Sequence, residues 1–335
     1  MADELIEKVG LTLMKVGDAL GIPNLDPESG LIFVTGGNGV VGHRVATKLL
    51  RAGYPQVRLG AHHPTEFADK NKDGAQIADF DWSRTDTYDK ALLGVKSVLC
   101  TAPYMKEWKK NFPFFLEACR YAGVKHFVKL SFYHARLIGD PFQNVPLVRA
   151  HGNCDEFLVK SGLPYTILGA THMMSNPMVL QGRELKRDQK PAVLYGASLH
   201  KGVNYVSPND IADVAVRVLM DPRPHHNKEY ALTGPEPIKD TQVAQLLSDH
   251  LKKPIMYVDQ SPHTFQQGER MSGDPDWMVE DLTTLETVKA SGYEQDREFA
   301  SNDIEKICGH PAETFGAYLL MTEAMTPMEM FNDDL

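Results

Sequence analysis

Residues 31–50, LIFVTGGNGVVGHRVATKLL, join a short apolar run, a group of glycines and a second apolar stretch with helical spacing. The first run predicts a buried strand, and the second predicts a helix that begins just after the glycines. Gly36 permits the sharp turn out of the sheet, Gly39 leaves room for a pyrophosphate, and Gly42 lets the helix lie close to the strand. Because the first amides of that helix have no intrahelical partner, the stretch predicts a dinucleotide-binding loop.

Strand-like and helix-like segments alternate beyond this loop. Strands are expected at 56–62, 75–80, 97–102, 126–131 and 165–170, with helical patterns between them. This alternation predicts an α/β fold, a Rossmann-type doubly wound parallel sheet with a smaller, mainly helical C-terminal lobe. The expected domains are an N-terminal helical extension and linker (1–30), a Rossmann domain (31–170, with 203–220 returning to it) and a smaller substrate or partner lobe (171–202 and 221–335).

The composition excludes several classes of protein. The 335 residues carry a formal net charge of −9 and no run of Lys or Arg, so general binding to nucleic acid or to an anionic membrane is not expected. The four cysteines are scattered without a CxxC pair, and the N-terminus lacks the positive charge of a signal peptide. We expect a cytoplasmic protein with reduced thiols. Clusters of potential metal ligands are absent from the sequence, so no metal is expected.

The tip of the second expected strand bears on the choice of cofactor. In VRLGAHHPTEF, residues 57–67, no acid occupies the tip, where an acid would bind the ribose 2′-hydroxyl of NAD. Arg58, His62 and His63 offer positive or donor groups there instead. This pattern favours NADP(H) over NAD(H), with His62 at the adenosine ribose. The alternative is that His62 and His63 are solvated loop residues.

The ends of the third and fourth expected strands supply further candidates. Asp79 can accept a hydrogen bond from the adenine amino group while Phe80 provides an apolar wall, or Asp79 can cap a turn. Thr101, Ala102 and Pro103 follow the fourth strand, where the chain passes the inner ribose and the phosphates of the cofactor.

The end of the fifth expected strand is the place to look for catalytic groups. Ser131 and Tyr133 leave the sheet at its carboxyl edge, and His151 lies near the start of the next helix. Tyr133 or His151 could donate a proton to a reduced carbonyl or quinone oxygen, Ser131 is expected beside the cofactor, and His172 is a third candidate donor. The alternative for each candidate donor is ordinary packing. A Tyr with a Lys four residues later, in the position usual for short-chain dehydrogenases, does not occur.

Several motifs in this order resemble the NmrA-like family of atypical short-chain dehydrogenases/reductases. They are VTGGNGVVG, ADFDW, GVKHFVKLSF, SGLPYTILGATHMMSN, VSPNDIADVAVRVL, YALTGPE and DIEKICGHPAETF, and the resemblance covers roughly residues 31–320. It implies a Rossmann domain with a C-terminal lobe, and NADP(H) or NAD bound through Gly36, Asn38, Gly39, Val40, Val41 and Gly42. The chain departs from the family pattern at His62, often Arg in members, at His151, commonly Lys in reductases, and at Gly169, which replaces Arg.

Two functions fit this resemblance. The first is an NADP(H)-dependent reductase that transfers a hydride to an apolar carbonyl or quinone-type acceptor. Met173, Met174 and Met178 favour it, because methionines suit a flat apolar ligand. The second is a non-catalytic NAD(P) redox sensor that binds a regulatory protein, which the departures at His151 and Gly169 favour. An isomerase or epimerase is a third possibility. The expected partner is accordingly a small apolar substrate or a regulatory protein.

Overall fold

The structure is a computed structural model that describes residues 30–65, 74–105, 108–181, 185 and 191–322. The expected N-terminal helix lies outside these residues. The chain forms two compact units by its contacts. Unit 1 comprises residues up to Ser131, His151–Gly169 and Ile211–Tyr230, and unit 2 comprises Phe132–Ala150, Ala170–Asp210 and the residues from Ala231 onward. The domain limits expected from the sequence stay a prediction.

A seven-stranded sheet forms the centre of unit 1. The strand order is β10-β6-β5-β4-β1-β2-β3, and the pairs β1–β2, β2–β3, β1–β4 and β4–β5 are parallel. The strands are β1 (Leu31–Val34), β2 (Val57–Ala61), β3 (Gln76–Asp79), β4 (Val95–Cys100), β5 (His126–Phe132), β6 (Tyr165–Ala170) and β10 (Lys228–Leu232). This is the Rossmann order extended by one strand, and it confirms the expected fold class.

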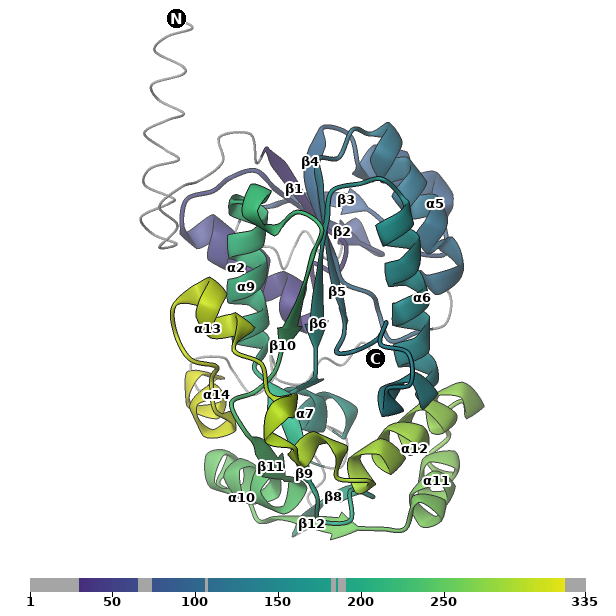
Figure 1. The fold of residues 1–335 in the computed structure, drawn as a ribbon, viewed down its shortest axis with the longest axis vertical. Coiled ribbons are helices and arrows are strands. Elements are labelled where there is room, and N and C mark those ends of the chain that lie inside the picture. Colours follow the sequence, from purple (N-terminus) through teal and green to yellow (C-terminus); the bar gives the residue numbers. More distant parts are fainter. Residues whose placement is uncertain (1–29, 66–73, 106–107, 182–184, 186–190, 323–335) are drawn as a thin grey trace, which may run out of the picture. The chain divides into compact units, whose positions relative to one another are not determined.

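Helices cover both faces of this sheet, as a doubly wound fold requires. Figure 1 shows α2 (Val40–Arg51) and α9 (Pro208–Met220) on one face and α5 (Trp108–Tyr121) and α6 (Pro146–Lys160) on the other. Lys48 of α2 pairs with Asp213 of α9 at 2.7 Å. The short elements are η1 (Thr85–Thr87), α4 (Tyr88–Ala91) and η3 (Arg223–His225).

The core of unit 1 explains why these apolar runs form strands. Phe33, Val98 and Phe127 are fully buried on three different strands and belong to one cluster with Phe115 of α5 and Leu158 of α6. Strands buried in this way read as continuous apolar runs rather than as alternating patterns. The α5 and α6 helices therefore pack on the sheet through their apolar faces.

Unit 2 combines helices with two small sheets, of order β11-β9-β7 and β12-β8. Its core gathers Met174, Leu194, Tyr205, Leu247 and Phe315. The elements are η2 (Pro141–Asn144), β7 (His172–Met173), α7 (Asn176–Leu180), β8 (Ala192–Gly196), β9 (Gly202–Val206), β11 (Pro237–Lys239), α10 (Asp240–Leu251), β12 (Ile255–Asp259), α11 (Pro262–Met271), α12 (Asp276–Ala290), η4 (Tyr293–Gln295), η5 (Arg297–Phe299), α13 (Asp303–Cys308) and α14 (Phe315–Thr322).

The described helices include none that combines the length and the apolar character needed to cross a bilayer.

Candidate functional site

The glycine loop joins the end of β1 to the start of α2. Gly39 is the N-cap of α2 in an ordinary extended conformation (φ −77°, ψ 163°), and its N–H donates to the Gly36 carbonyl at 3.0 Å. No side chain caps the helix, and its first turn holds no acid. The amides of Val40, Val41 and Gly42 therefore lack intrahelical acceptors at the positive end of the helix, an arrangement suited to an anion.

The three spaced glycines have different surroundings. A Cβ atom on Gly42 would lie 2.0 Å from the Gly36 carbonyl oxygen, so α2 and the loop pack too closely for any other residue. A Cβ on Gly36 would lie 2.3 Å from the Thr101 hydroxyl oxygen. A Cβ on Gly39 would meet only the Gly36 carbonyl oxygen, at 3.3 Å. Packing thus demands Gly36 and Gly42, whereas Gly39 leaves space above exposed Asn38 and the free amides, which fits a diphosphate.

The sheet order places this loop where dinucleotides bind in open α/β sheets. The chain runs from β1 to β2 on one side and places β4 on the other, so β1 and β4 flank the point where the strand order reverses. Thr35 and Thr101, directly after these two strands, are hydrogen-bonded to each other. Ala102 and Pro103 continue from Thr101. Thr101 thus lies beside Gly36 of the glycine loop, and the placement of Ala102 and Pro103 along a cofactor stays a prediction.

Four polar side chains meet beyond the ends of β2 and β3. His62 Nε2 lies 3.0 Å from an Asp81 carboxylate oxygen, and Arg84 contacts Asp81 at 3.1 Å and Asp79 at 2.5 Å. Burial opposes the ionisation of Asp81, but hydrogen bonds from Ser83 and Arg84 and the charge on His62 outweigh it and lower the Asp81 pKa. The group therefore combines an ionised carboxylate with the Arg84 guanidinium and the His62 ring just beyond the ends of β2 and β3.

Arg58, Asp79 and His63 were expected to offer polar groups to the cofactor, and in the structure each contacts other side chains or backbone groups of the protein. Arg58 does not join this group, because its guanidinium contacts the Ala91 and Leu93 carbonyl oxygens and the Gln76 side chain. Asp79 is ion-paired with Arg84. His63 is exposed and lies 3.0 Å from the His62 ring, which orients His62 without adding a second contact to Asp81.

Phe80 packs inside the core rather than on an open wall. Its ring is 3% exposed and lies 5.3 Å from the Phe33 ring and 5.4 Å from the Tyr88 ring. Trp82 and Phe115 complete this aromatic cluster. Because the ring is packed in this cluster, a contact of the Phe80 ring with adenine would require displacement of core packing.

Ser131 belongs to a buried polar group in unit 1, and the partly exposed His151 borders it. Ser131 Oγ donates to Asp155 at 2.5 Å, and the Lys129 ammonium pairs with Asp155 at 2.7 Å. His151 Nδ1 lies 3.2 Å from Lys129 Nζ, and the imidazole lies 5.0 Å from the Trp108 ring. Burial, with the charge of Lys129 beside it, lowers the pKa of His151 well below its ordinary value.

Tyr133 and His172 lie in unit 2 and are engaged by their neighbours. The Tyr133 hydroxyl donates to the Phe299 carbonyl oxygen at 3.0 Å, and burial raises the pKa of Tyr133 to about 12. His172 Nε2 lies 3.0 Å from a carboxylate oxygen of buried Glu294. Of the two expected catalytic residues, Tyr133 already uses its hydroxyl in a hydrogen bond. His151 retains a ring nitrogen, Nε2, that has no hydrogen bond within the part of the chain that the structure describes.

The methionines expected on the substrate side have mixed environments. Met174 and Met178 are 1% exposed in the core of unit 2, whereas Met173 is partly exposed. Core filling, the ordinary use of this residue type, accounts for the first two.

The sequence reasoning missed Asp81, Arg84, Lys129 and Asp155. For Lys129 and Asp155, the spacing from expected site residues could have indicated a role. Lys129 lies two residues before Ser131 on a strand, and Asp155 lies four residues after His151 on a helix, so each pair shares one face of its element. For Arg84 the sequence offers no such spacing, because the conformation of the turn after β3 determines where its side chain points.

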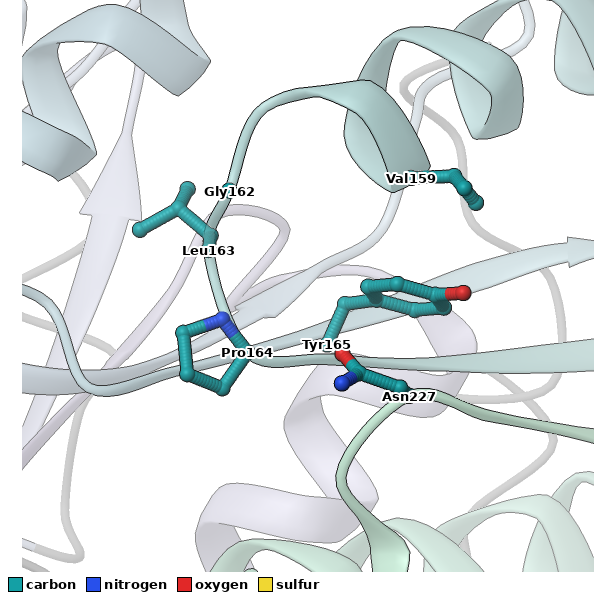
Figure 2. A pocket seen from close by; sticks show the side chains of 6 residues that line it. All are labelled: Val159, Gly162, Leu163, Pro164, Tyr165 and Asn227. Carbon is teal, nitrogen blue, oxygen red and sulfur yellow. The ribbon is translucent and has the colours of Figure 1, made fainter.

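A pocket of about 380 Å³ lies at the start of β6, whereas the glycine loop follows the end of β1. Figure 2 shows its lining residues, Val159, Gly162, Leu163, Pro164, Tyr165 and Asn227. The lining holds no charged side chain, and none of the candidate site residues contributes to it. We therefore assign it no part in cofactor binding.

Comparisons with known proteins agree with this geometry. A family model described as NAD(P)H-binding matches residues 36–222. An NAD(P)H azoreductase of Xenophilus azovorans is 26% identical over 288 residues, which cover 86% of this chain and 96% of that protein.

Two solved structures share the fold. An NADPH-dependent quinone oxidoreductase of Escherichia coli, complexed with NADPH, has a TM-score of 0.72 and 23% identity, and the match covers 88% of this chain and 100% of that chain. A mutant NmrA has a TM-score of 0.67 and 18% identity, covering 90% of this chain and 97% of that chain. At these identities the likeness concerns the fold alone.

Proposed function

Because the chain belongs to the NAD(P)H-binding family, we propose that it is an NADP(H)-dependent reductase that transfers a hydride to an apolar carbonyl or quinone-type acceptor. The observation that carries the proposal is the uncapped N-terminus of α2, set against the space over Gly39 at the point where the strand order reverses. Backbone amides in that position hold a pyrophosphate without any charged side chain.

Different residues of the chain hold different parts of the cofactor. When bound, the cofactor supplies the hydride. The amides of Val40, Val41 and Gly42 hold the diphosphate, with Gly36, Asn38 and Gly39 shaping the loop. Thr101, Ala102, Pro103 and Ser131 follow β4 or end β5 and line the way toward the nicotinamide. Such positioning supplies much of the rate for electrophilic acceptors.

The preference for NADP(H) rests on the cations near the end of β2. Arg84 is a bidentate donor suited to a phosphate, and its side chain is 44% exposed at that position. His62 adds a second donor, 61% exposed. Asp81 opposes them as an acceptor for a ribose hydroxyl, so we expect NADPH to be preferred over NADH without exclusion of NADH.

The acceptor class follows from two considerations. The similar protein of Xenophilus azovorans is an azoreductase by name, and an azo group is a flat, conjugated acceptor. In this chain His151, as a ring with a lowered pKa, can supply a neutral hydrogen-bond donor rather than a fixed charge, which suits an apolar acceptor. Between the two expected catalytic residues we therefore propose His151, because Tyr133 is committed to Phe299.

The proposal is tested with the full-length protein. NADPH and NADH are titrated separately by fluorescence, and oxidation of NADPH is then followed with panels of quinones, conjugated carbonyls and azo dyes. We expect tighter binding of NADPH and turnover with at least one panel.

Two other results would change the assignment. Binding of oxidised and reduced nucleotide with no turnover on any panel would favour a redox sensor that acts through a regulatory protein. Failure to bind either nucleotide would remove the basis of the proposal.

A further inference from the structure

A buried ion pair lies inside unit 1, between β5 and α6. The side chains of Lys129 and Asp155 are both fully buried, and their charged atoms lie 2.7 Å apart. A buried pair of this kind rarely adds stability over apolar packing, since each ion loses its hydration. Its presence in the core calls for a role other than stability.

The Lys129 ammonium has close neighbours on each side. One faces Asp155 at 2.7 Å and one faces His151 Nδ1 at 3.2 Å. The remaining side is lined by the rings of Trp108 and Phe112, whose centroids lie 5.8 and 5.9 Å from Nζ. An ammonium has three donors and no acceptor, so Lys129 donates to two polar partners and faces two aromatic rings.

The other end of the group is equally fixed. Asp155 accepts a hydrogen bond from Ser131 Oγ at 2.5 Å in addition to its pair with Lys129. Lys129 and Ser131 lie on one face of β5, and His151 and Asp155 lie one turn apart on α6. Two residues of β5 thus face two residues of α6, and the contacts between them hold all four side chains in place.

Hydrogen-bond chemistry then determines the state of the imidazole. Because the ammonium can only donate, His151 Nδ1 has to accept, and in a neutral imidazole the hydrogen then sits on Nε2. We propose that Lys129, held by Asp155 and Ser131, is a positioning residue that keeps His151 as the neutral tautomer with its hydrogen on Nε2. Within the described residues Nε2 has no hydrogen-bond partner, so it is the atom left to meet a ligand.

The neighbouring ionisable groups support a fixed state. Burial, and then the Lys129 charge, lower the pKa of His151 well below its ordinary value. Cys154 on α6 and Cys100 on β4 also face this group, and burial raises the pKa of each thiol to about 12, so both stay neutral. Among the described residues, the charge of Lys129 acts directly on the ring, and the exposed Lys109 of α5 acts on neighbouring Cys154.

A consequence for the reaction rests on the proposed function. An Nε2–H donor can hydrogen-bond to the acceptor oxygen on which negative charge grows as the hydride arrives at carbon. The imidazole keeps its hydrogen, and solvent delivers the proton that completes the product. Specificity for acceptors with an exposed oxygen or nitrogen lone pair follows from this contact.

The state of His151 is measured directly by nitrogen NMR of the full-length, ¹⁵N-histidine-labelled protein. The signal is assigned by its loss in His151→Gln. We expect the coupling pattern of an Nε2–H tautomer that stays unchanged from about pH 5 to pH 8, where an ordinary histidine titrates. A signal with the hydrogen on Nδ1, or one that titrates near the ordinary value, would overturn the proposal.

Two variants test the part played by Lys129. Lys129→Met should mix the two tautomers, shift the His151 pKa upward because a neighbouring cation is lost, and lower kcat about 10-fold or more with little change in the KM for NADPH. That variant removes the charge that offsets buried Asp155, which keeps its hydrogen bond from Ser131. The double variant Lys129→Met with Asp155→Leu removes both charges and should fold with the same loss of tautomer.

Lys110→Met is the matched control, since Lys110 is exposed on α5 and lies outside this group. It should leave the His151 signal and kcat unchanged. An unchanged tautomer in the double variant would contradict the positioning role. The NMR result stands by itself: if no acceptor is reduced, the proposed function fails, while the His151 tautomer still decides this inference.

Discussion

The Thr35 hydroxyl bridges both backbone groups of Thr101: it donates to the Thr101 carbonyl oxygen at 2.9 Å and accepts from the Thr101 N–H at 3.0 Å. These residues follow β1 and β4, the two strands that flank the reversal in strand order. Gly36 comes next and has no room for a side chain against Thr101. One hydroxyl therefore fixes the spacing of the two strand ends beside the glycine loop.

Replacing Thr35 by Val should break this bridge while preserving side-chain shape. We expect the free energy of unfolding to fall by about 1–3 kcal/mol, because the variant loses both hydrogen bonds in a buried place. NADPH affinity should fall as well, since the strand ends lose their fixed spacing. Chemical denaturation and fluorescence titration measure the two effects. Thr35→Ser keeps the oxygen and should behave like wild type, and equal behaviour of the two variants would contradict the role of the bridge.

Gly39 and Gly42 should respond to substitution in opposite ways. Gly39→Asp should leave the fold stable to within about 1 kcal/mol but abolish NADPH binding, because its carboxylate repels the diphosphate. Gly42→Ala should lower the free energy of unfolding by roughly 1–3 kcal/mol, since its Cβ would overlap the Gly36 carbonyl oxygen. Retained affinity in a folded Gly39→Asp protein would show that the nucleotide lies elsewhere.

The side chains near the end of β2 should set the nucleotide preference. Arg84→Ala should weaken NADPH binding about 10- to 100-fold and NADH binding much less, because only NADPH offers a phosphate to the guanidinium. His62→Asp should shift the preference toward NADH. Separate titrations with both nucleotides measure this. Arg120→Ala, on the exposed face of α5, is the control, and equal losses for both nucleotides in Arg84→Ala would argue for a purely structural role.

Tyr133→Phe should separate packing from catalysis. The hydroxyl donates to the Phe299 carbonyl oxygen inside unit 2, so its loss should cost about 1 kcal/mol of stability. We expect kcat to change by less than about 3-fold, in contrast to the loss of about 100-fold or more expected for His151→Gln. A comparable drop in kcat for Tyr133→Phe would instead make Tyr133 the donor.

Acid should destabilise unit 1 through His126. This ring is fully buried, its Nε2 lies 2.9 Å from the Thr166 hydroxyl, and burial lowers its pKa from 6.5 to about 3. Below pH 6.5, His126 binds a proton in the unfolded chain but not in the folded chain. The free energy of unfolding therefore falls as the pH drops from 6.5 toward about 3. The loss over that window is on the order of 4 kcal/mol.

Urea unfolding at several pH values tests this dependence. His126→Gln should flatten the slope over the same window, whereas His43→Gln, a change at an exposed position of α2, should not. A slope that persists in His126→Gln would assign the acid sensitivity to other groups.

Local sequence patterns were sufficient to predict the fold class, which the seven-stranded sheet confirms, and to single out residues 36–42 as the proposed nucleotide loop. Both depend on local patterns: apolar runs of strand length, helical spacing after the glycines, and the absence of side chains at Gly36 and Gly42, which the close backbone approach confirms. The chain belongs to the NAD(P)H-binding family and shares its fold with NmrA, in agreement with the resemblance to NmrA-like proteins. The loop signal lies within residues 31–50, whereas the family motifs are spread over roughly residues 31–320.

Which polar groups act together depends on long-range packing. Phe80 reads as a strand-end wall in the sequence but is drawn into the aromatic core, because burying its ring outweighs exposing it at the strand end. Lys129 reads as a charged interruption of a strand, and its partner Asp155 is 26 residues away. Their pairing depends on how α6 lies on the sheet, a long-range packing relationship that no local pattern encodes.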